Sequence, residues 1–303
     1  MTLTVVALGG NALVRAGERG TAAEQLARVR ETAAALGPLL DEPLVVTHGN
    51  GPQVGNELLR QERAADEVPP LPLYLAVAQT QAEIGALIAA ALRSMSRRPV
   101  ACLLTHVLVA AEDAAFADPA KPVGPFYDAA RAESLQGERG WTLAHEEGRG
   151  WRRTVPSPHP LEVLELEAVR SLLAAGTTTV ACGGGGIPVV RRNGVLTGVD
   201  AVVDKDRASA LLGIALGAER LVLVTNVDAV LRDFGTARAE RIATLSAREA
   251  DELAPELPAG SMRPKLEAAA AFVYATGGEA LITSAEAFGM AADGRAGTRV
   301  VAK

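Results

Sequence analysis

The feature that most constrains the fold is a run of four glycines, Gly183–Gly186, set between two apolar, β-branched segments. The segment before it, Thr177–Ala181, follows Gly176 and is typical of a buried strand in a parallel sheet. Residues without a Cβ atom can adopt positive φ angles and let backbone amides approach a ligand closely. Such a concave turn suits an anion, most often a phosphate, and we prefer this interpretation to a flexible linker.

The rest of the chain alternates short apolar strands with amphipathic helices, a pattern that predicts a mainly parallel sheet covered by helices on both faces. The expected strands are 2–8, 44–47, 100–109, 177–181, 220–225, 280–283 and 299–302. The expected helices are 22–36, 53–65, 74–95, 161–175, 206–216, 246–253 and 264–276. A hairpin is expected over 187–196, with its turn at Arg192-Asn193-Gly194.

Residues 111–160 interrupt this alternation. The segment is polar, rich in glycine, proline and charge, and contains both tryptophans, Trp141 and Trp151. It is too long for an ordinary connection and shows no sustained helical or strand period. We therefore expect it to form an inserted lid or small subdomain.

Composition excludes several classes of protein. The net charge of -6 provides no basic excess to neutralise a nucleic-acid backbone, so no nucleic-acid partner is expected. The first ten residues have no basic segment typical of a signal peptide, and the longest apolar run, 84–92, is far shorter than the ~20 residues of a membrane span. Cys102 and Cys182 lie in apolar runs and are expected to be core thiols. These features predict a cytoplasmic protein with no membrane association.

The established nucleotide-binding fingerprints do not occur in this sequence. A P-loop would need G-x-x-x-x-G-K-[ST], which the chain lacks. The glycine run leads into Ile187-Pro188 rather than into a helix, so the dinucleotide-binding fingerprint lacks its structural context. A P-loop enzyme is excluded, and a Rossmann dehydrogenase is disfavoured.

Lysine is scarce in this chain: among 30 basic residues, only Lys121, Lys205, Lys265 and Lys303 are lysines. In a chain that otherwise uses arginine, a lysine indicates a position where a compact ammonium group is needed, although chance survival is the alternative. Lys205 lies at the start of an expected helix between Asp204 and Asp206, where a helix cap with a solvated charge cluster is the alternative. Lys265 lies in the first turn of another expected helix, where a cation gains little unless it faces a bound phosphate. Lys121 lies in the lid-like segment and could approach the same cleft when ligand binds.

Turns that contain glycine and asparagine follow several of the predicted strands. Because the carboxyl ends of parallel strands meet at one edge of a sheet, we expect these turns to line one ligand cleft. Glycine amides and asparagine side chains are suitable donors for oxyanions. The candidate substrate- and phosphate-binding residues are Gly9, Gly10, Asn11, Gly49, Asn50, Gly51, Gly184 and Gly185. A looser turn, Gly260-Ser261, precedes the helix that carries Lys265.

Seven segments closely resemble carbamate kinases, a branch of the amino acid kinase family. They are ALGGNAL (7–13), HGNGPQVGN (48–56), KPVGPF (121–126), GRGWRRTVPSPHP (148–160), CGGGGIPVV (182–190), VVDKDRAS (202–209) and GSMRPKLEAA (260–269). The resemblance implies a three-layer αβα sandwich with an open, mainly parallel sheet, a small protruding subdomain over the cleft, and a homodimer. It also implies one domain over 1–303, with a substrate lobe at about 1–176, the inserted subdomain at about 111–160 and a nucleotide lobe at about 177–303.

The activity implied by this resemblance is reversible phosphoryl transfer between ATP and carbamate, giving ADP and carbamoyl phosphate, run toward ATP synthesis with Mg²⁺ on the nucleotide. We expect direct in-line transfer, in which positioning and charge stabilisation supply the rate. We assign Lys205 and Lys265 to the transferring phosphoryl group and the ADP phosphates, and Lys121 to carbamate or phosphoryl oxygens. Asp206 is expected to hold the lysines in place. Further nucleotide-binding candidates are Thr225, Asp228 and Met262.

The sequence departs from the family pattern at several positions. Ala7 stands where many amino acid kinases carry a lysine, so the cation is expected to come from Lys121. The family pattern T-Q-G-x-I-G appears at 80–85 with Ala82 in place of glycine, and Ala86 stands where an aromatic residue is common; these changes could alter the substrate pocket or the subunit contact. Asn226 stands where Gly or Asp is usual and could change nucleotide affinity. Two alternatives stay open: a sister kinase that phosphorylates another small acid, and a non-catalytic ligand sensor on the same fold.

Overall fold

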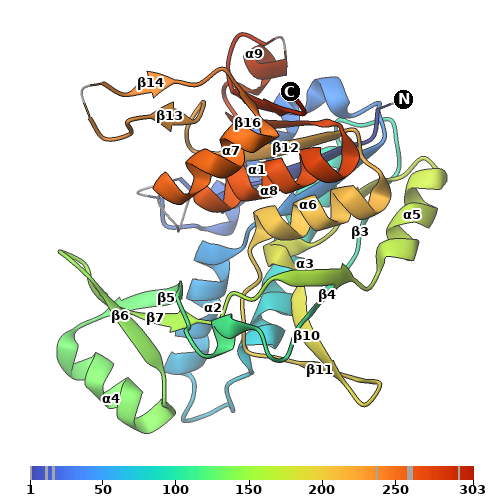
Figure 1. The fold of residues 1–303 in the computed structure, drawn as a ribbon. Coiled ribbons are helices and arrows are strands. Elements are labelled where there is room, and N and C mark those ends of the chain that lie inside the picture. The colour runs from blue at the N-terminus through green and yellow to red at the C-terminus, as the bar shows by residue number, and fades with distance from the viewer. Residues whose placement is uncertain (1, 11–12, 16–17, 237, 258–261, 293) are drawn as a thin grey trace.

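A large open sheet of eight strands forms the centre of the computed structural model, which describes residues 2–10, 13–15, 18–236, 238–257, 262–292 and 294–303 (Figure 1). Neighbouring strands are parallel except for β16 and β17. In sheet order the strands are β15 (Thr244–Ser246), β17 (Thr298–Val301), β16 (Glu279–Ser284), β12 (Arg220–Thr225), β1 (Thr4–Leu8), β2 (Leu44–His48), β9 (Thr178–Val180) and β3 (Val100–Cys102).

Helices cover both faces of this sheet, because its central strands are apolar on both sides. In β1, Val5 and Ala7 face the cluster that contains the apolar residues of α6, α7 and α8, whereas Val6 and Leu8 face the cluster that contains those of α1, α3 and α9. Figure 1 shows α6, α7 and α8 side by side over one face. The helix bounds are α1 (Ala22–Ala35), α3 (Leu73–Arg93), α5 (Leu166–Ala174), α6 (Lys205–Leu216), α7 (Ala247–Leu253), α8 (Arg263–Thr276) and α9 (Phe288–Ala292). The predicted αβα sandwich is confirmed.

A second, four-stranded sheet corrects two sequence predictions. Its order is β11 (Val195–Gly198), β10 (Ile187–Arg192), β4 (His106–Val109) and β8 (Pro160–Val163). The strand predicted over 100–109 is therefore two strands in different sheets, and the helix predicted over 161–175 begins with a strand. The chain leaves the large sheet at Thr105, whose backbone N–H donates to Gln81 Oε1 of α3 at 2.6 Å. The predicted hairpin is confirmed, with positive φ angles at Asn193 and Gly194.

A small antiparallel sheet with one helix projects from the body beside α2 (Gly51–Arg63) (Figure 1). It contains β5 (Lys121–Tyr127), α4 (Ala129–Arg139), β6 (Thr142–Glu146) and β7 (Gly150–Val155), in the strand order β5-β7-β6. Arginines stack on its aromatic rings: the guanidinium carbons of Arg149 and Arg153 lie 4.2 and 4.3 Å from the ring centres of Phe126 and Trp141. Because such contacts supplement a small aliphatic core, the segment shows little hydrophobic periodicity in the sequence. We call residues 121–155 the subdomain; the division of the chain into two lobes stays a prediction.

The helix α3 is the one described helix that is long and apolar enough to cross a membrane by length and composition. More than half of its most apolar window is buried within the protein, as in the core helix of a globular domain. Ile84, Ile88 and Leu92 of α3 pack into the core on the α1 face of the large sheet. The remaining strands, β13 (Leu231–Arg232) and β14 (Glu240–Arg241), form a two-residue-long pairing that is too short to predict from sequence.

Candidate active site

The glycine turns after β1, β2 and β9 meet at the carboxyl edge of the large sheet, because these strands are parallel and adjacent. A Cβ atom on Gly49 would lie 3.2 Å from Lys205 Cδ and 3.8 Å from the Gly10 amide nitrogen. A Cβ atom on Gly184 would lie 2.4 Å from Asn50 Nδ2. The three turns and Lys205 therefore share one site, whereas Asn11 lies outside the described residues.

Two of the three singled-out lysines meet on one carboxylate. Lys205 Nζ donates to Asp206 Oδ1 at 2.5 Å, and Lys265 Nζ donates to Asp206 Oδ2 at 3.0 Å. Lys205 and Asp206 begin α6, Lys265 lies in the first turn of α8, and these two helices pack together. Burial lowers the pKa of Lys205, and the neighbouring Lys265 charge lowers it further, against the effect of Asp206. An anion at this position would relieve that cost, since it favours the charged ammonium.

Lys121 reaches the same cluster from the subdomain. Its Nζ donates to Asp204 Oδ2 at 2.7 Å. The other oxygen of Asp204 caps α6 by accepting the backbone N–H of Asp206 at 2.9 Å. Burial by itself would raise the pKa of Asp204, but the charges of Lys121, Lys205 and Lys265 hold it well below its usual range. Three ammonium groups thus surround two carboxylates, which leaves a cationic site beside the glycine turns.

The four consecutive glycines are required by close packing. A Cβ atom on Gly183, Gly184, Gly185 or Gly186 would lie between 2.2 and 2.4 Å from its nearest neighbour: His48 Nε2, Asn50 Nδ2, Val203 O and Val107 Cγ2, in that order. The amide of Gly185, which we expected to face a phosphate, donates to Cys182 O at 3.0 Å. The glycine run therefore forms a tight turn from β9 in one sheet to β10 in the other. Gly185 is needed in this turn for its positive φ angle rather than as a phosphate donor.

The sequence predicted Asn50 at the site but not the other residues of its buried polar floor, His48, Thr80 and Gln81. Gln81 Nε2 donates to Gly183 O at 2.9 Å, and Asn50 Nδ2 donates to Thr80 Oγ1 at 2.9 Å. His48 is fully buried, and burial together with the Lys205 charge lowers its pKa to about 4. His48 is therefore neutral at physiological pH. The sequence signals for this floor are the segment 48–56, which contains His48 and Asn50, and the segment 80–85, which resembles the family pattern T-Q-G-x-I-G.

The predicted nucleotide-binding residues lie farther along the same edge. Thr225 ends β12, and Asp228 Oδ1 accepts a hydrogen bond from Ser284 Oγ of β16 at 2.6 Å. Met262 immediately precedes α8, so it is three residues from Lys265. Gly9 packs against β12, since a Cβ atom there would lie 2.7 Å from Val224 O. Gly260 and Ser261 lie outside the described residues.

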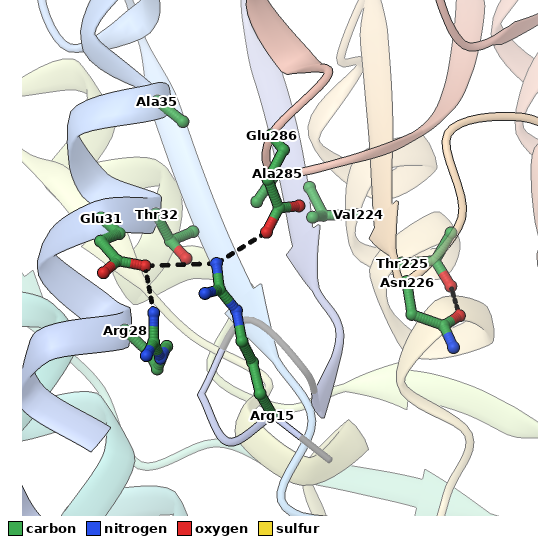
Figure 2. Close-up of a pocket in the computed structure, with 10 residues that line it drawn as sticks. All are labelled: Arg15, Arg28, Glu31, Thr32, Ala35, Val224, Thr225, Asn226, Ala285 and Glu286. Atoms are coloured by element: carbon green, nitrogen blue, oxygen red, sulfur yellow. Dashed lines mark hydrogen bonds and ion pairs between the residues drawn. The ribbon is translucent and has the colours of Figure 1, made fainter. Parts of the chain in front are cut away.

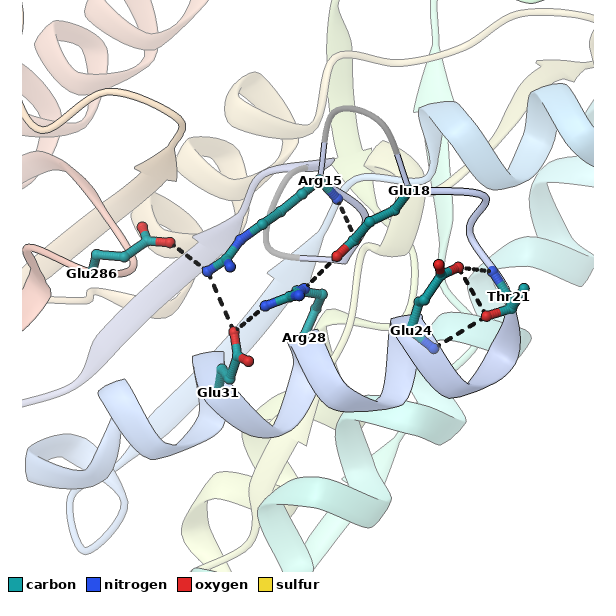
Figure 3. Close-up of polar contacts among 7 residues, drawn as sticks. All are labelled: Arg15, Glu18, Thr21, Glu24, Arg28, Glu31 and Glu286. Atoms are coloured by element: carbon teal, nitrogen blue, oxygen red, sulfur yellow. Dashed lines mark hydrogen bonds and ion pairs between the residues drawn. The ribbon is translucent and has the colours of Figure 1, made fainter.

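A separate cavity of about 400 Å³ opens beside Thr225 and Asn226, between α1 and the loop after β16 (Figure 2). Arg15 crosses its mouth, with Nη2 2.8 Å from Glu286 Oε1 and 3.3 Å from Glu31 Oε2 (Figure 3). Arg28 joins this network from α1 through the same Glu31 oxygen (Figure 3). The three lysines do not line this cavity. We therefore treat the cavity as distinct from the lysine site, although Thr225, a predicted nucleotide-binding residue, lines it.

The departures at Ala82 and Ala86 lie away from the lysine site. Both residues are exposed, one turn apart, on the outer face of α3. Their neighbour Gln81 is buried and points to the glycine run. The family-like Gly85 packs against Cys102, whose Sγ would lie 2.4 Å from a Cβ atom at that position.

Comparison with known proteins identifies the family. The model of the amino acid kinase family matches residues 2–284. This chain belongs to the amino acid kinase family. The carbamate kinase of Pyrococcus horikoshii is 39% identical over 98% of each chain, and that of Halobacterium salinarum is 42% identical over 99% of each. The family assignment made from the sequence is confirmed.

Solved structures agree with this assignment. The carbamate kinase of Giardia lamblia bound to AMP-PNP has a TM-score of 0.92 with this chain at 35% identity, covering 99% of this chain and 98% of that one. The isopentenyl phosphate kinase of T. acidophilum is 12% identical with a TM-score of 0.59, so it shares the fold alone. Within the amino acid kinase family, this chain is therefore most informatively compared with carbamate kinases.

Proposed function

We propose that this chain is a carbamate kinase, which interconverts ATP and carbamate with ADP and carbamoyl phosphate. The observation that carries the proposal is the pair Lys205 and Lys265 on Asp206, set against the Gly49 turn at the carboxyl edge of the sheet. Full-length similarity to proteins named carbamate kinase supports the choice of substrate over the sister-kinase alternative. The retained lysines and carboxylates argue against a sensor without catalytic activity.

In the proposed reaction a carbamate oxygen attacks the γ-phosphorus of ATP in line, and the bond between that phosphorus and the ADP oxygen breaks as the new one forms. Lys205 and Lys265 neutralise the phosphoryl and ADP oxygens while Asp206 keeps both ammonium groups in place. Amides of the turns at Gly9-Gly10-Asn11 and Asn50-Gly51 donate to the developing charge. The Gly49 amide, which we expected among them, donates to Leu8 O at 2.9 Å, so Gly49 contributes its close approach to Lys205. Lys121 adds the third cation from the subdomain side.

The Lys121–Asp204 contact supports a role for this third cation at the edge of the site. Asp204 also caps α6, so the same carboxylate fixes both the helix that presents Lys205 and the ammonium group of Lys121. His48 contributes no charge, since its pKa of about 4 keeps the ring neutral. We assign it to the packing of the Gly183 turn.

Mg²⁺ enters this scheme as part of the nucleotide substrate. Among the residues that the structure describes, no group of three or more His, Cys, Asp or Glu side chains could hold a metal ion. Both Asp206 oxygens are bonded to lysines. The donors at the site are ammonium and amide groups, which suit phosphate oxygens. Mg²⁺ would therefore keep phosphate and water ligands, as it commonly does.

We propose that the enzyme is a cytoplasmic homodimer, with about 1–176 as the substrate lobe and about 177–303 as the nucleotide lobe. The exposed small residues Ala82 and Ala86 on α3 lie on a helix that packs beside β3, the edge strand of the large sheet. The exposed face of α3 and the free edge of β3 support a subunit contact on this side of the molecule. The departures at the two alanines would then affect that contact.

The purified protein tests this function directly. We expect ATP to form from ADP, Mg²⁺ and carbamoyl phosphate, measured with a coupled luminescence assay. ATP consumption with other small acids but not with carbamate would favour a sister kinase. Binding of ADP without turnover of any acid would favour the sensor.

A further inference from the structure

We propose that Glu62 is a positioning residue that keeps Lys121 at the active site by clamping the far end of β5 to α2. The inference rests on the proposed function, because it concerns how Lys121 is delivered to the lysine cluster. Glu62 lies outside every motif that identified the family.

The strand β5 is attached to the body at both ends. Its first residue, Lys121, contacts Asp204 at the active site. Its last residue, Tyr127, donates its hydroxyl to Glu62 Oε2 at 2.8 Å. The second Glu62 oxygen accepts from Arg131 Nη2, in the first turns of α4, at 2.7 Å. One carboxylate therefore holds the end of β5 and the start of the following helix.

The helix α2 connects this clamp to the substrate turn. Asn50 precedes α2, Gly51 begins it, and Glu62 is its penultimate residue, about 16 Å further along at 1.5 Å per residue. Between the two ends, Gly55 packs on Gly124 of β5: a Cβ atom on Gly55 would lie 3.4 Å from Gly124 Cα. β5 thus lies along α2, and a change at Glu62 acts on the same strand that begins with Lys121.

The charge state of the clamp favours a strong contact. The Glu62 side chain is 11% exposed. Burial by itself would raise the pKa of Glu62, but the bonds from Arg131 and Tyr127 hold it below its usual range. Burial and the bond to Glu62 raise the pKa of Tyr127, so its hydroxyl stays protonated as a donor. A charge-assisted contact in such a site is worth more than an exposed ion pair.

Ionic attachment of the subdomain depends on few contacts. Among the described residues, two ion pairs join residues 121–155 to the rest of the protein: Lys121 with Asp204, and Arg131 with Glu62. The pair Arg149 with Glu146 lies within the subdomain. Within the part of the chain that the structure describes, loss of Glu62 would leave the Lys121–Asp204 pair as the ionic attachment of the subdomain, beside the apolar contact of Val123 and Val155 with the body. The far end of β5 would then lack its charged contact with α2.

The tryptophan fluorescence of this protein can report on how the subdomain packs against α2. Both of its tryptophans, Trp141 and Trp151, lie in the subdomain. The ring of Trp141 is 6.5 Å from that of Tyr127, and Trp141 lines a cavity of about 340 Å³ whose other wall includes Glu62 of α2. Tryptophan emission therefore reports on the contact between the subdomain and α2.

The test compares Glu62→Gln with Glu57→Gln. Glu57 is a matched control, since it lies on the same helix and its carboxylate accepts hydrogen bonds from Arg60 and Gln61 of α2 itself. We expect Glu62→Gln to lower kcat/KM for carbamoyl phosphate about 10-fold, because small misplacement of a catalytic group is costly, and to shift the tryptophan emission. We expect an unchanged Kd for ADP. Tyr127→Phe removes one bond of the clamp, so a smaller loss in the same direction is expected even if Glu62→Gln fails to fold.

A double-mutant cycle separates positioning from general damage. In a Lys121→Ala background, Glu62→Gln is expected to have no further effect on turnover, because the group that it positions is gone. Equal fold-losses in both backgrounds, or wild-type kcat/KM in folded Glu62→Gln and Tyr127→Phe, would overturn the proposal. If the unmodified protein forms no ATP, the proposed function fails. Unchanged tryptophan emission in Glu62→Gln would then refute the clamp independently.

Discussion

The two carboxylates at the site, Asp206 and Asp204, hold their lysines in different ways. Lys205 and Lys265 share Asp206 with side chains that are 13% and 10% exposed, at the starts of two helices packed on the central sheet. Lys121 meets Asp204 with a side chain that is 32% exposed, on a strand that belongs to the projecting subdomain. The first contact is held in place by the protein core. The second depends on how a small sheet docks on α2.

The largest expected effect comes from the buried pair. Lys265→Ala and Lys205→Ala should each lower kcat about 10²–10³-fold, by analogy with the loss of one preorganised donor. Each change also leaves a buried Asp206 oxygen without its ammonium partner. Steady-state ATP formation measures the loss, and Lys303→Ala at the exposed C-terminus is the control. Wild-type turnover in either variant would show that the buried pair is not the phosphate site.

The buried side of the comparison also predicts a pH dependence of stability. The pKa of His48 is lowered from 6.5 to about 4 in the folded protein. The unfolded chain therefore binds more protons than the folded one between these values, and stability falls as the pH falls through this window. From pH 7.5 to 5 the free energy of unfolding should decrease by about 2 kcal/mol from this residue. Urea unfolding of His48→Gln should show a smaller decrease. Equal pH dependence in wild type and His48→Gln would contradict the assignment.

A smaller effect is expected at the exposed contact. Lys121→Arg keeps the charge but replaces a compact ammonium with a planar guanidinium. We expect kcat to fall about 10-fold, because the larger guanidinium cannot reproduce the donor geometry of the ammonium group. The loss stays moderate because the subdomain can shift to make room, and the Kd for ADP should be unchanged. Stopped assays and ADP titration measure the two quantities. Full activity would mean that any cation serves there, and would weaken the argument from scarce lysines.

The smallest effect is expected in the charged network at the mouth of the separate cavity (Figure 3). The side chains of Arg15, Glu31 and Glu286 are 45%, 54% and 66% exposed. Arg15→Ala should lower the free energy of unfolding by less than about 1 kcal/mol, and high salt should reduce this difference. Chemical denaturation at two salt concentrations measures it. A larger, salt-independent loss would show that Arg15 matters to the loop that follows the first glycine turn.

Most elements of the large sheet could be predicted from the sequence. The strand β12 has the bounds expected for it, and α1, α6 and α8 begin or end within one or two residues of their predicted limits. These elements could be predicted because short stretches of sequence specify them: apolar runs mark the strands, and capping residues and glycines mark the helix ends. The errors at 100–109 and 161–175 occur where a long-range contact decides the path, as when Gln81 draws Thr105 out of the sheet.

The sequence by itself determined the kinds of group at the site: scarce lysines and glycine turns at the ends of strands. Only the tertiary structure decided which groups meet. Lys121 and Asp204 are 83 residues apart, and Lys265 and Asp206 are 59 apart. The order of the strands in the sheet and the docking of β5 on α2 bring these groups together. Local periodicity specifies neither, because it reports on one element at a time, whereas a site at a sheet edge depends on how several elements pack.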